Sequence, residues 1–111
     1  REFQGVQFKL AEMSACLEGA RGLMERAARA QMNGDPRGRR LSSAAKWMAS
    51  ETAMRVTRDA VQLFGGYGYS REYPVERLFR DAKVTEIYEG ANEIHRVIIA
   101  RQLYAERGDD T

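Results

Sequence analysis

The stretch "FQGVQFKLAEMSACLEGARGLMERA", residues 3–27, carries apolar or small side chains at alternating steps of three and four residues. An α-helix turns once in about 3.6 residues, so this spacing gathers those side chains into one stripe. The spacing therefore predicts a long amphipathic helix. Asn33 and Gly34 predict where it ends, since glycine tolerates the left-handed conformation that commonly follows a helix. The stripe comprises Phe3, Val6, Leu10, Met13, Leu17, Ala20, Met24 and Ala27.

A second long helix is predicted from Ser42 or Ser43 to Phe64, after a polar connection at 35–40 that contains two helix breakers, Pro36 and Gly38. Small residues dominate its expected inner face, which would allow neighbouring helices to approach closely. The residues of that face are Ala45, Ala49, Ala53 and Ala60, set among Met48, Val56 and Leu63. Residues 65–74, "GGYGYSREYP", are predicted to form a loop because three glycines and a proline oppose helix.

The remaining residues predict a short helix from Pro74 to about Lys83 and a last helix that begins between Gly90 and Glu93. The last helix is expected to carry Ile94, Val97 and Ile98 inward. The fold class is therefore all-α, an up-and-down bundle of three long helices plus one short helix, in a single domain over residues 1–111. Three amphipathic helices leave one side uncovered, so we expect a further helix or a partner subunit there.

Composition narrows the class of function. With 43% hydrophobic and 31% charged residues the chain is globular, and a net charge of +2 gives no support for nucleic-acid binding. No apolar run is long enough to span a membrane. The single Cys16 excludes an internal disulfide and any cysteine-based metal site, and the lone His95 cannot hold a metal alone. We expect no metal, no nucleic acid and no membrane, and a reducing compartment: the cytoplasm, or the mitochondrial matrix in a eukaryote.

Three features invite a functional interpretation. The glycines of "QLFGGYGY", residues 62–69, could let backbone N–H groups approach a phosphate or a ring edge, or they could simply end a helix. Arg101 continues the apolar stripe of the last helix, where it either pairs at an interface or extends its charged end into water. Glu89 stands between Tyr88 and Gly90. It is either a favourable charge at a helix N-terminus or a general base made more basic by apolar surroundings.

Taken together, "EFQGVQFKLAEM", "AAKWMASETAMRVTRDAVQLFGGYGYSREYPVERLFRDAKV" and "EIYEGANEIHRVIIAR" resemble the C-terminal helical domain of the flavin-dependent acyl-CoA dehydrogenases. The resemblance covers nearly the whole chain, with the segments in the family's order. It implies that Glu89 of the "YEG" motif is the base that removes the α-proton of an acyl-CoA thioester, with Tyr88 and Gly90 against the substrate. The β-hydrogen would leave as hydride to the flavin, giving a trans-2-enoyl-CoA.

The resemblance also assigns contacts with FAD. Gln62, Gly65 and Gly66, and less firmly Gly68, correspond to the turn that touches the flavin bound by a neighbouring subunit. Ala91 and Glu93 correspond to residues near the flavin phosphates. At Ala91 the family commonly has threonine or serine, so Asn92 or backbone N–H groups would have to replace the missing hydroxyl.

The resemblance implies a homo-oligomer, dimer or tetramer, and an electron-transfer flavoprotein as electron acceptor in fatty-acid β-oxidation. We expect this chain to be a piece of a longer enzyme that lacks the first helix of its domain, and to be inactive and without FAD when alone. Two alternatives stay open. One is an acyl-CoA oxidase-like relative, with a nitroalkane-oxidising enzyme disfavoured because its base is typically aspartate. The other is a catalytically silent helical oligomerisation module.

Overall fold

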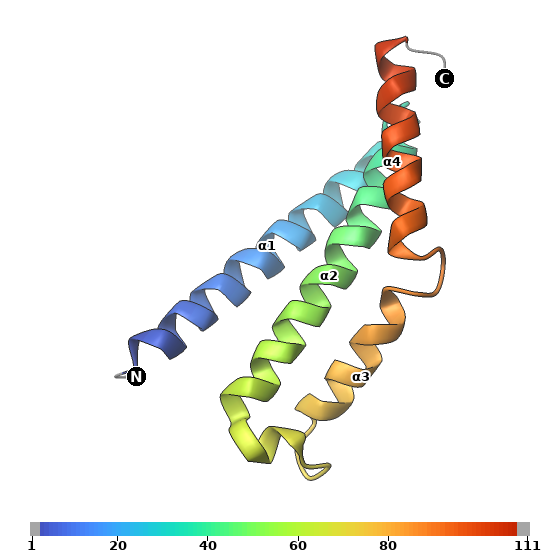
Figure 1. Cartoon of the computed structure of the whole chain (residues 1–111). Helices are drawn as coiled ribbons and strands as arrows, with labels where there is room; N and C mark the ends of the chain where they lie inside the picture. The colour runs from blue at the N-terminus through green and yellow to red at the C-terminus, as the bar shows by residue number, and fades with distance from the viewer. Residues whose placement is uncertain (1–2, 109–111) are drawn as a thin grey trace.

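The computed structural model describes residues 3–108, and the regular secondary structure of that range is entirely helical (Figure 1). This confirms the all-α prediction. Helix α1 spans Gln4–Met32 and α2 spans Gly38–Phe64. A short 3₁₀ helix, η1, covers Gly65–Tyr69. Helix α3 spans Val75–Thr85 and α4 spans Asn92–Arg107.

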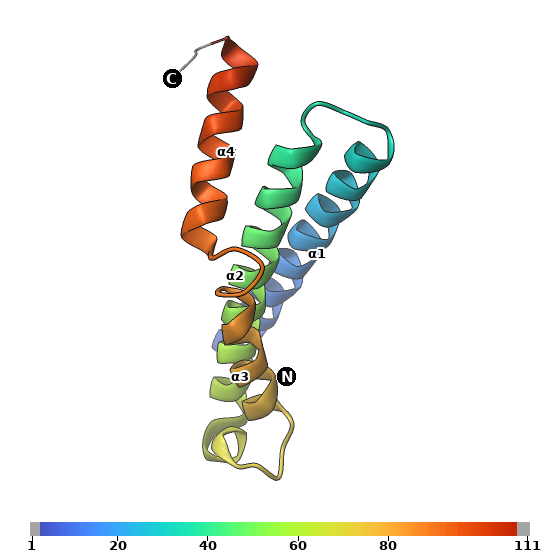
Figure 2. The ribbon, with the colours of Figure 1, turned by 90° about the vertical axis from the view of Figure 1, so that its right-hand side faces the viewer.

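Helix α2 is the centre of the arrangement. Helix α1 lies antiparallel along one side of it, while α3 and α4 follow each other along another side (Figures 1 and 2). Among the described residues α2 contacts every other element, whereas α1 packs on α2 alone. The loop between α3 and α4 lies beside α2, whose Lys46 contacts it (Figure 2).

Helix α2 begins at Gly38, earlier than predicted. The Asp35 side chain accepts a hydrogen bond of 2.8 Å from the Arg37 N–H, and this turns the chain directly into the helix. Gly38 does not break the helix but is buried in its first turn. A Cβ there would lie 3.3 Å from the side chain of Gln31, so glycine lets α1 and α2 approach closely at this end.

The predicted loop 65–74 is wrong in its first half, because residues 65–69 continue as η1. Gly65 ends α2 with a φ of 65°, a conformation that favours glycine. Gly68 is needed for packing: a Cβ at this position would lie 2.5 Å from the carbonyl oxygen of Val61. The chain then reaches α3 through Pro74, as predicted.

The core is thin. Its buried apolar residues are mostly alanines, and no large side chain of residues 3–108 is fully buried. The radius of gyration is 17.0 Å, whereas a compact domain of this length has about 13 Å. The prediction that Ile94 and Val97 point inward is wrong, since both are exposed. Of the expected inner face of α2, Ala45 is buried but Ala49, Ala53 and Ala60 are only partly covered, and Met48 is exposed.

Much of the predicted α1 stripe is also uncovered: Phe3 is 76% exposed and Met24 55%. Shallow grooves run between these side chains and α2. The grooves and exposed side chains form what we call the open apolar face, which agrees with the expectation that three helices leave one side uncovered. Its residues are Phe3 just before α1, Val6, Leu17 and Met24 of α1, and Ala49, Ala53 and Leu63 of α2.

Candidate active site

Glu89 lies in the loop that joins α3 to α4, and its backbone is strained. Its φ of 54° is the only positive value at a non-glycine residue in the described chain, and Gly90 follows with a φ of 87°. This left-handed conformation costs an ordinary residue about 1 kcal/mol. Such a conformation persists only where surrounding contacts hold it, and it is concentrated at functional sites.

Side chains from two helices hold the carbonyl groups of this loop. Lys46, on α2, donates a hydrogen bond of 2.8 Å from Nζ to the carbonyl oxygen of Gly90. His95, on α4, has Nε2 3.1 Å from the carbonyl oxygen of Glu89. Side chains from two different helices thus hold two consecutive carbonyls.

Asn92 connects the loop to α2. It is only 4% exposed, and its Oδ1 accepts a hydrogen bond of 2.9 Å from Lys46 Nζ. Its Nδ2 donates to Ser50 Oγ at 2.9 Å, and its N–H donates to the Glu86 carbonyl at 3.1 Å. We refer to Lys46, Ser50, Asn92 and His95 as the loop-anchoring network. The network fixes both ends of the residues that carry Glu89.

The Glu89 carboxylate itself makes no ion pair or hydrogen bond with any residue of the range 3–108. It opens onto a groove of about 320 Å³, which we call the Glu89 groove. The apolar enclosure expected from Tyr88 is not formed by the described residues, since both Tyr88 and Glu89 are exposed. The groove is lined by Lys46, Ala49, Ser50, Ala53, Thr85, Tyr88 and Glu89, so it adjoins the open apolar face at Ala49 and Ala53.

The residues assigned to the flavin turn lie elsewhere. Gln62, Gly65 and Gly66 are exposed at the far end of α3 from Glu89 (Figure 1), and the 11 residues of α3 correspond to a length of about 16 Å. A Cβ at Gly65 or Gly66 would meet nothing within 4 Å, so their backbone is open to a ligand from outside. An exposed amide beside bare backbone fits the edge of a flavin or a phosphate. Gly68 differs, because its missing side chain allows close packing against the Val61 carbonyl within the chain.

The residues assigned to the flavin phosphates are at the start of α4. Ala91 is the N-cap residue, with no side-chain hydrogen bond to the helix, and Glu93 is exposed in the first turn. Asn92 does not supply the missing hydroxyl: its side chain is buried against α2 and engaged with Ser50 and Lys46. That part of the prediction is wrong, and backbone N–H groups remain as the candidates for this contact.

Lys46 and Ser50 were missed by sequence reasoning, and His95 was considered only as a metal ligand. One signal was present. In "AAKWMAS" a lysine and a serine, four residues apart, share the edge of an alanine-rich helix face. Polar groups in such a position need partners, because burying them unpaired is costly.

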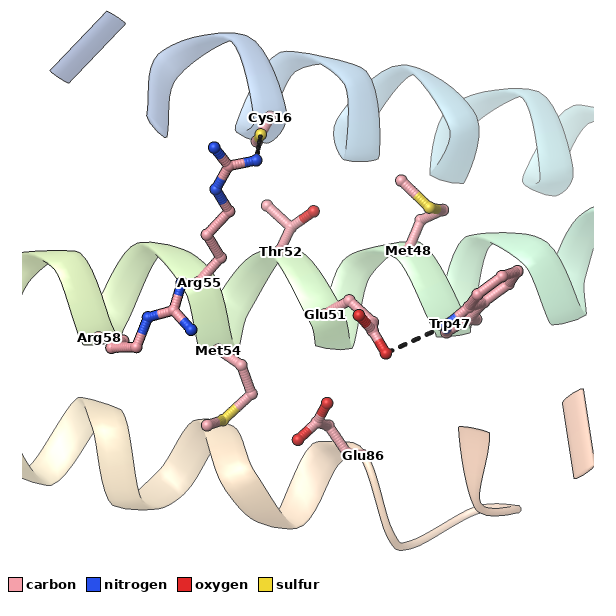
Figure 3. Close-up of a pocket in the computed structure, with 9 residues that line it drawn as sticks. All are labelled: Cys16, Trp47, Met48, Glu51, Thr52, Met54, Arg55, Arg58 and Glu86. Atoms are coloured by element: carbon pink, nitrogen blue, oxygen red, sulfur yellow. Dashed lines mark hydrogen bonds between the residues drawn. The ribbon is translucent and has the colours of Figure 1, made fainter. Parts of the chain in front are cut away.

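A second groove lies on the other side of α2, between α1 and α3 (Figure 3). Its volume is about 480 Å³, and polar side chains line much of it. Several of these side chains bond to one another: Arg55 donates to Cys16 Sγ at 3.4 Å, and Trp47 donates to Glu51 at 3.2 Å. Arg55 also pairs at 3.1 Å with Glu12, which lies outside the groove lining. Within residues 3–108 no cluster of His, Cys, Asp or Glu is suited to a metal ion, and no helix is long and apolar enough to cross a membrane.

Comparison with known proteins assigns the chain to a family. A family model described as acyl-CoA dehydrogenase, C-terminal domain, matches residues 1–104. The chain belongs to this family. It is 50% identical over 105 residues to the cyclohexane-1-carbonyl-CoA dehydrogenase of Geobacter metallireducens, covering 95% of this chain and 27% of that protein.

Solved structures agree. The chain superposes on the butyryl-CoA dehydrogenase of Megasphaera elsdenii with a TM-score of 0.88 and 50% identity, over 92% of this chain and 26% of that one. A chain in a structure described as the electron transferring flavoprotein of Acidaminococcus fermentans gives a TM-score of 0.88 and 47% identity, over 92% of this chain and 27% of that one. The chain thus spans about a quarter of the length of these acyl-CoA dehydrogenase relatives.

Proposed function

We propose that this chain is the C-terminal domain of an FAD-dependent acyl-CoA dehydrogenase, in which Glu89 removes the α-proton of an acyl-CoA thioester. The observation that carries the proposal is the conformation of the loop. Glu89 is held at a strained φ by bonds to its neighbouring carbonyls, while its own carboxylate is unpaired and faces an open groove. The strained backbone and the two held carbonyls distinguish Glu89 from the other exposed carboxylates of the described chain.

The backbone of the loop supports the same chemistry. The Glu89 N–H has no acceptor among residues 3–108, so it is available to the thioester carbonyl oxygen. A donor at that oxygen stabilises the enolate-like charge that develops as the α-proton leaves. Gly90 adds no side chain beside the carboxylate, and Tyr88 can cover the bound thioester. FAD, when bound, supplies the acceptor for the β-hydrogen as hydride, and the product is a trans-2-enoyl-CoA.

The two groups of flavin-contacting residues support a homo-oligomer. Gln62, Gly65 and Gly66 lie at one end of α3, while Ala91 and Glu93 lie beyond its other end. We propose that the first group contacts the FAD of a neighbouring subunit and the second group the FAD of its own subunit. The open apolar face gives a dimer or tetramer surface to bury.

This domain does not determine which acyl group the substrate carries. The chain is equally similar, at 50% identity, to a cyclohexane-1-carbonyl-CoA dehydrogenase and to a butyryl-CoA dehydrogenase. We therefore propose only an acyl-CoA substrate, with β-oxidation as the general setting. The similarity to a chain in an electron transferring flavoprotein structure supports such a flavoprotein as the electron acceptor.

The test is Glu89→Gln in the full-length enzyme that contains this chain. The amide cannot accept the α-proton, so the rate with an acyl-CoA and an artificial electron acceptor should fall by about 10²–10⁴-fold while the visible flavin absorbance is unchanged. Near-normal turnover would sink the assignment of the base. Oxygen consumption that replaces the need for an acceptor would favour an oxidase-like relative, and a full-length protein without flavin would favour a silent oligomerisation module.

A further inference from the structure

Lys46 is the only side chain of α2 that bonds directly to the backbone of the Glu89 loop in the described structure. We infer that Lys46 is a positioning residue: by holding the Gly90 carbonyl and Asn92, it aims the Glu89 carboxylate at the reacting carbon. The inference rests on the proposed role of Glu89 as the base. It adds a residue from a different helix, 43 positions earlier in the chain, to the machinery of proton removal.

The geometry shows why the loop needs such a residue. The left-handed φ at Glu89 sets the direction in which its side chain leaves the backbone. Without restraint, a non-glycine residue moves to the more populated β or right-handed regions, and the carboxylate would then point elsewhere. Lys46 holds the carbonyl oxygen of Gly90 itself. Gly90 has a φ of 87°, and as a glycine its backbone would otherwise rotate most freely.

The chemistry of Lys46 suits this role. Its ammonium donates to the Gly90 carbonyl at 2.8 Å and to Asn92 Oδ1 at 2.9 Å, although it lines the same groove as the Glu89 carboxylate. It makes no ion pair with that carboxylate. The positive charge is therefore used to hold the backbone, and the base is left with its lone pairs free.

A matched control is present in the same pair of helices. Arg40 of α2 pairs with Glu106 of α4 at 2.8 Å, at the opposite end of α4 from the loop. Both basic residues tie α4 to α2, but only Lys46 touches the residues that carry Glu89. A role in docking the helix would be shared by Arg40 and Lys46, whereas a role in aiming the base would belong to Lys46 alone.

The experiment measures proton removal without oxidation, in the full-length flavin-loaded enzyme. The substrate is 3,3-dimethylbutanoyl-CoA, which has α-hydrogens but no β-hydrogen to leave as hydride. In D₂O the base takes an α-proton, exchanges it with solvent and returns a deuteron, and mass spectrometry follows the deuterium gained. Flavin content, thermal midpoint and thioester affinity are measured beside it.

Lys46→Met should slow this exchange by about tenfold to a hundredfold, because small displacements of a reacting group carry penalties of that order. Thioester affinity should stay within about twofold, and Lys46→Arg should recover most of the rate, since a guanidinium can donate to the same carbonyl. Arg40→Met should match Lys46→Met in thermal midpoint yet exchange at close to the wild-type rate.

Equal exchange in Lys46→Met and wild type, or equal losses in Lys46→Met and Arg40→Met, would overturn the inference. Should Lys46→Met lose flavin, Lys46→Leu takes its place: it removes the same donor with a shorter apolar side chain, and unchanged exchange in that variant overturns the inference equally. Glu89→Gln separates the two claims. If it abolishes exchange while Lys46→Met does not alter it, only the positioning role fails. If Glu89→Gln exchanges normally, the base assignment fails and the positioning role with it.

Discussion

Two glycines of η1, Gly68 and Gly66, differ in that the first is needed for packing and the second is open to a ligand, and substitution should reveal the difference. A Cβ at Gly68 would lie 2.5 Å from the Val61 carbonyl oxygen and 2.8 Å from the Phe64 Cβ. Neither neighbour can move easily, because one is backbone of α2 and the other is a Cβ atom. We expect Gly68→Ala to destabilise the fold by about 1–3 kcal/mol, the usual cost of overpacking.

Gly66 is the matched position two residues earlier. A Cβ there meets nothing within 4 Å, and its φ is not positive. Gly66→Val should therefore leave stability nearly unchanged while its branched side chain fills the space that a flavin would occupy. In the full-length enzyme, Gly66→Val should lose flavin, whereas the main effect of Gly68→Ala should be a lower thermal stability.

The assay is thermal unfolding of this chain by circular dichroism, at one fixed protein concentration because association would shift the midpoint. For a domain of about this size each kcal/mol corresponds to roughly 4 °C. Gly68→Ala should thus melt lower by about 4–12 °C, and Gly66→Val should stay close to wild type. Equal midpoints for the two variants would refute the packing argument. Full flavin retention by Gly66→Val in the full-length enzyme would mean that the turn only ends helix α2 and does not contact the flavin.

Two further predictions concern charge and assembly. The side chain and then the N–H of Arg37 hold the pKa of Asp35 at about 2, below the 3.8 of the unfolded chain. Asp35 therefore stabilises the fold above pH 3.8 and loses that effect as the pH falls toward 2. Asp35→Asn should melt lower than wild type at neutral pH, the difference in melting temperature should shrink as the pH falls through 2, and a constant difference would contradict this. The open apolar face predicts self-association at micromolar concentration, and Arg101, exposed and unpaired within residues 3–108, is the candidate for a contact made on assembly. Sedimentation should show a dimer or tetramer that Leu17→Glu weakens, whereas a stable monomer with a sharp melting transition would count against it.

Hydrophobic periodicity was sufficient to predict the helices, because each long helix needs one apolar stripe. Their ends were harder. Gly38 was interpreted as a breaker, yet it is a point of close approach between α1 and α2, and only the position of Gln31 shows this. Residues 65–69 continue as a 3₁₀ helix, the tighter winding that frequently follows the end of an α-helix.

The sequence proposes a chemistry for the site but not its geometry. The motif around Glu89 suggests this residue as a base by resemblance, whereas its positive φ and its held carbonyls arise from contacts between distant segments. Lys46 and Asn92 are 46 residues apart, and nothing in either local sequence pairs them. The prediction that Tyr88 encloses the carboxylate failed for a related reason. Enclosure needs surfaces on several sides, and the described residues supply only one.

The central place of α2 has a consequence for how the molecule opens. Since α1 packs on α2 alone, and α3 and α4 pack along another side of α2, the chain consists of two units that share one helix. Each unit can lose its outer partner without disturbing the other. Amide hydrogens of α1 should therefore exchange through local opening events that leave the amides of α2 and α3 protected. The Glu89 loop belongs to the unit in which Lys46, Ser50 and Asn92 join α2 to α4, and none of these hydrogen bonds involves α1.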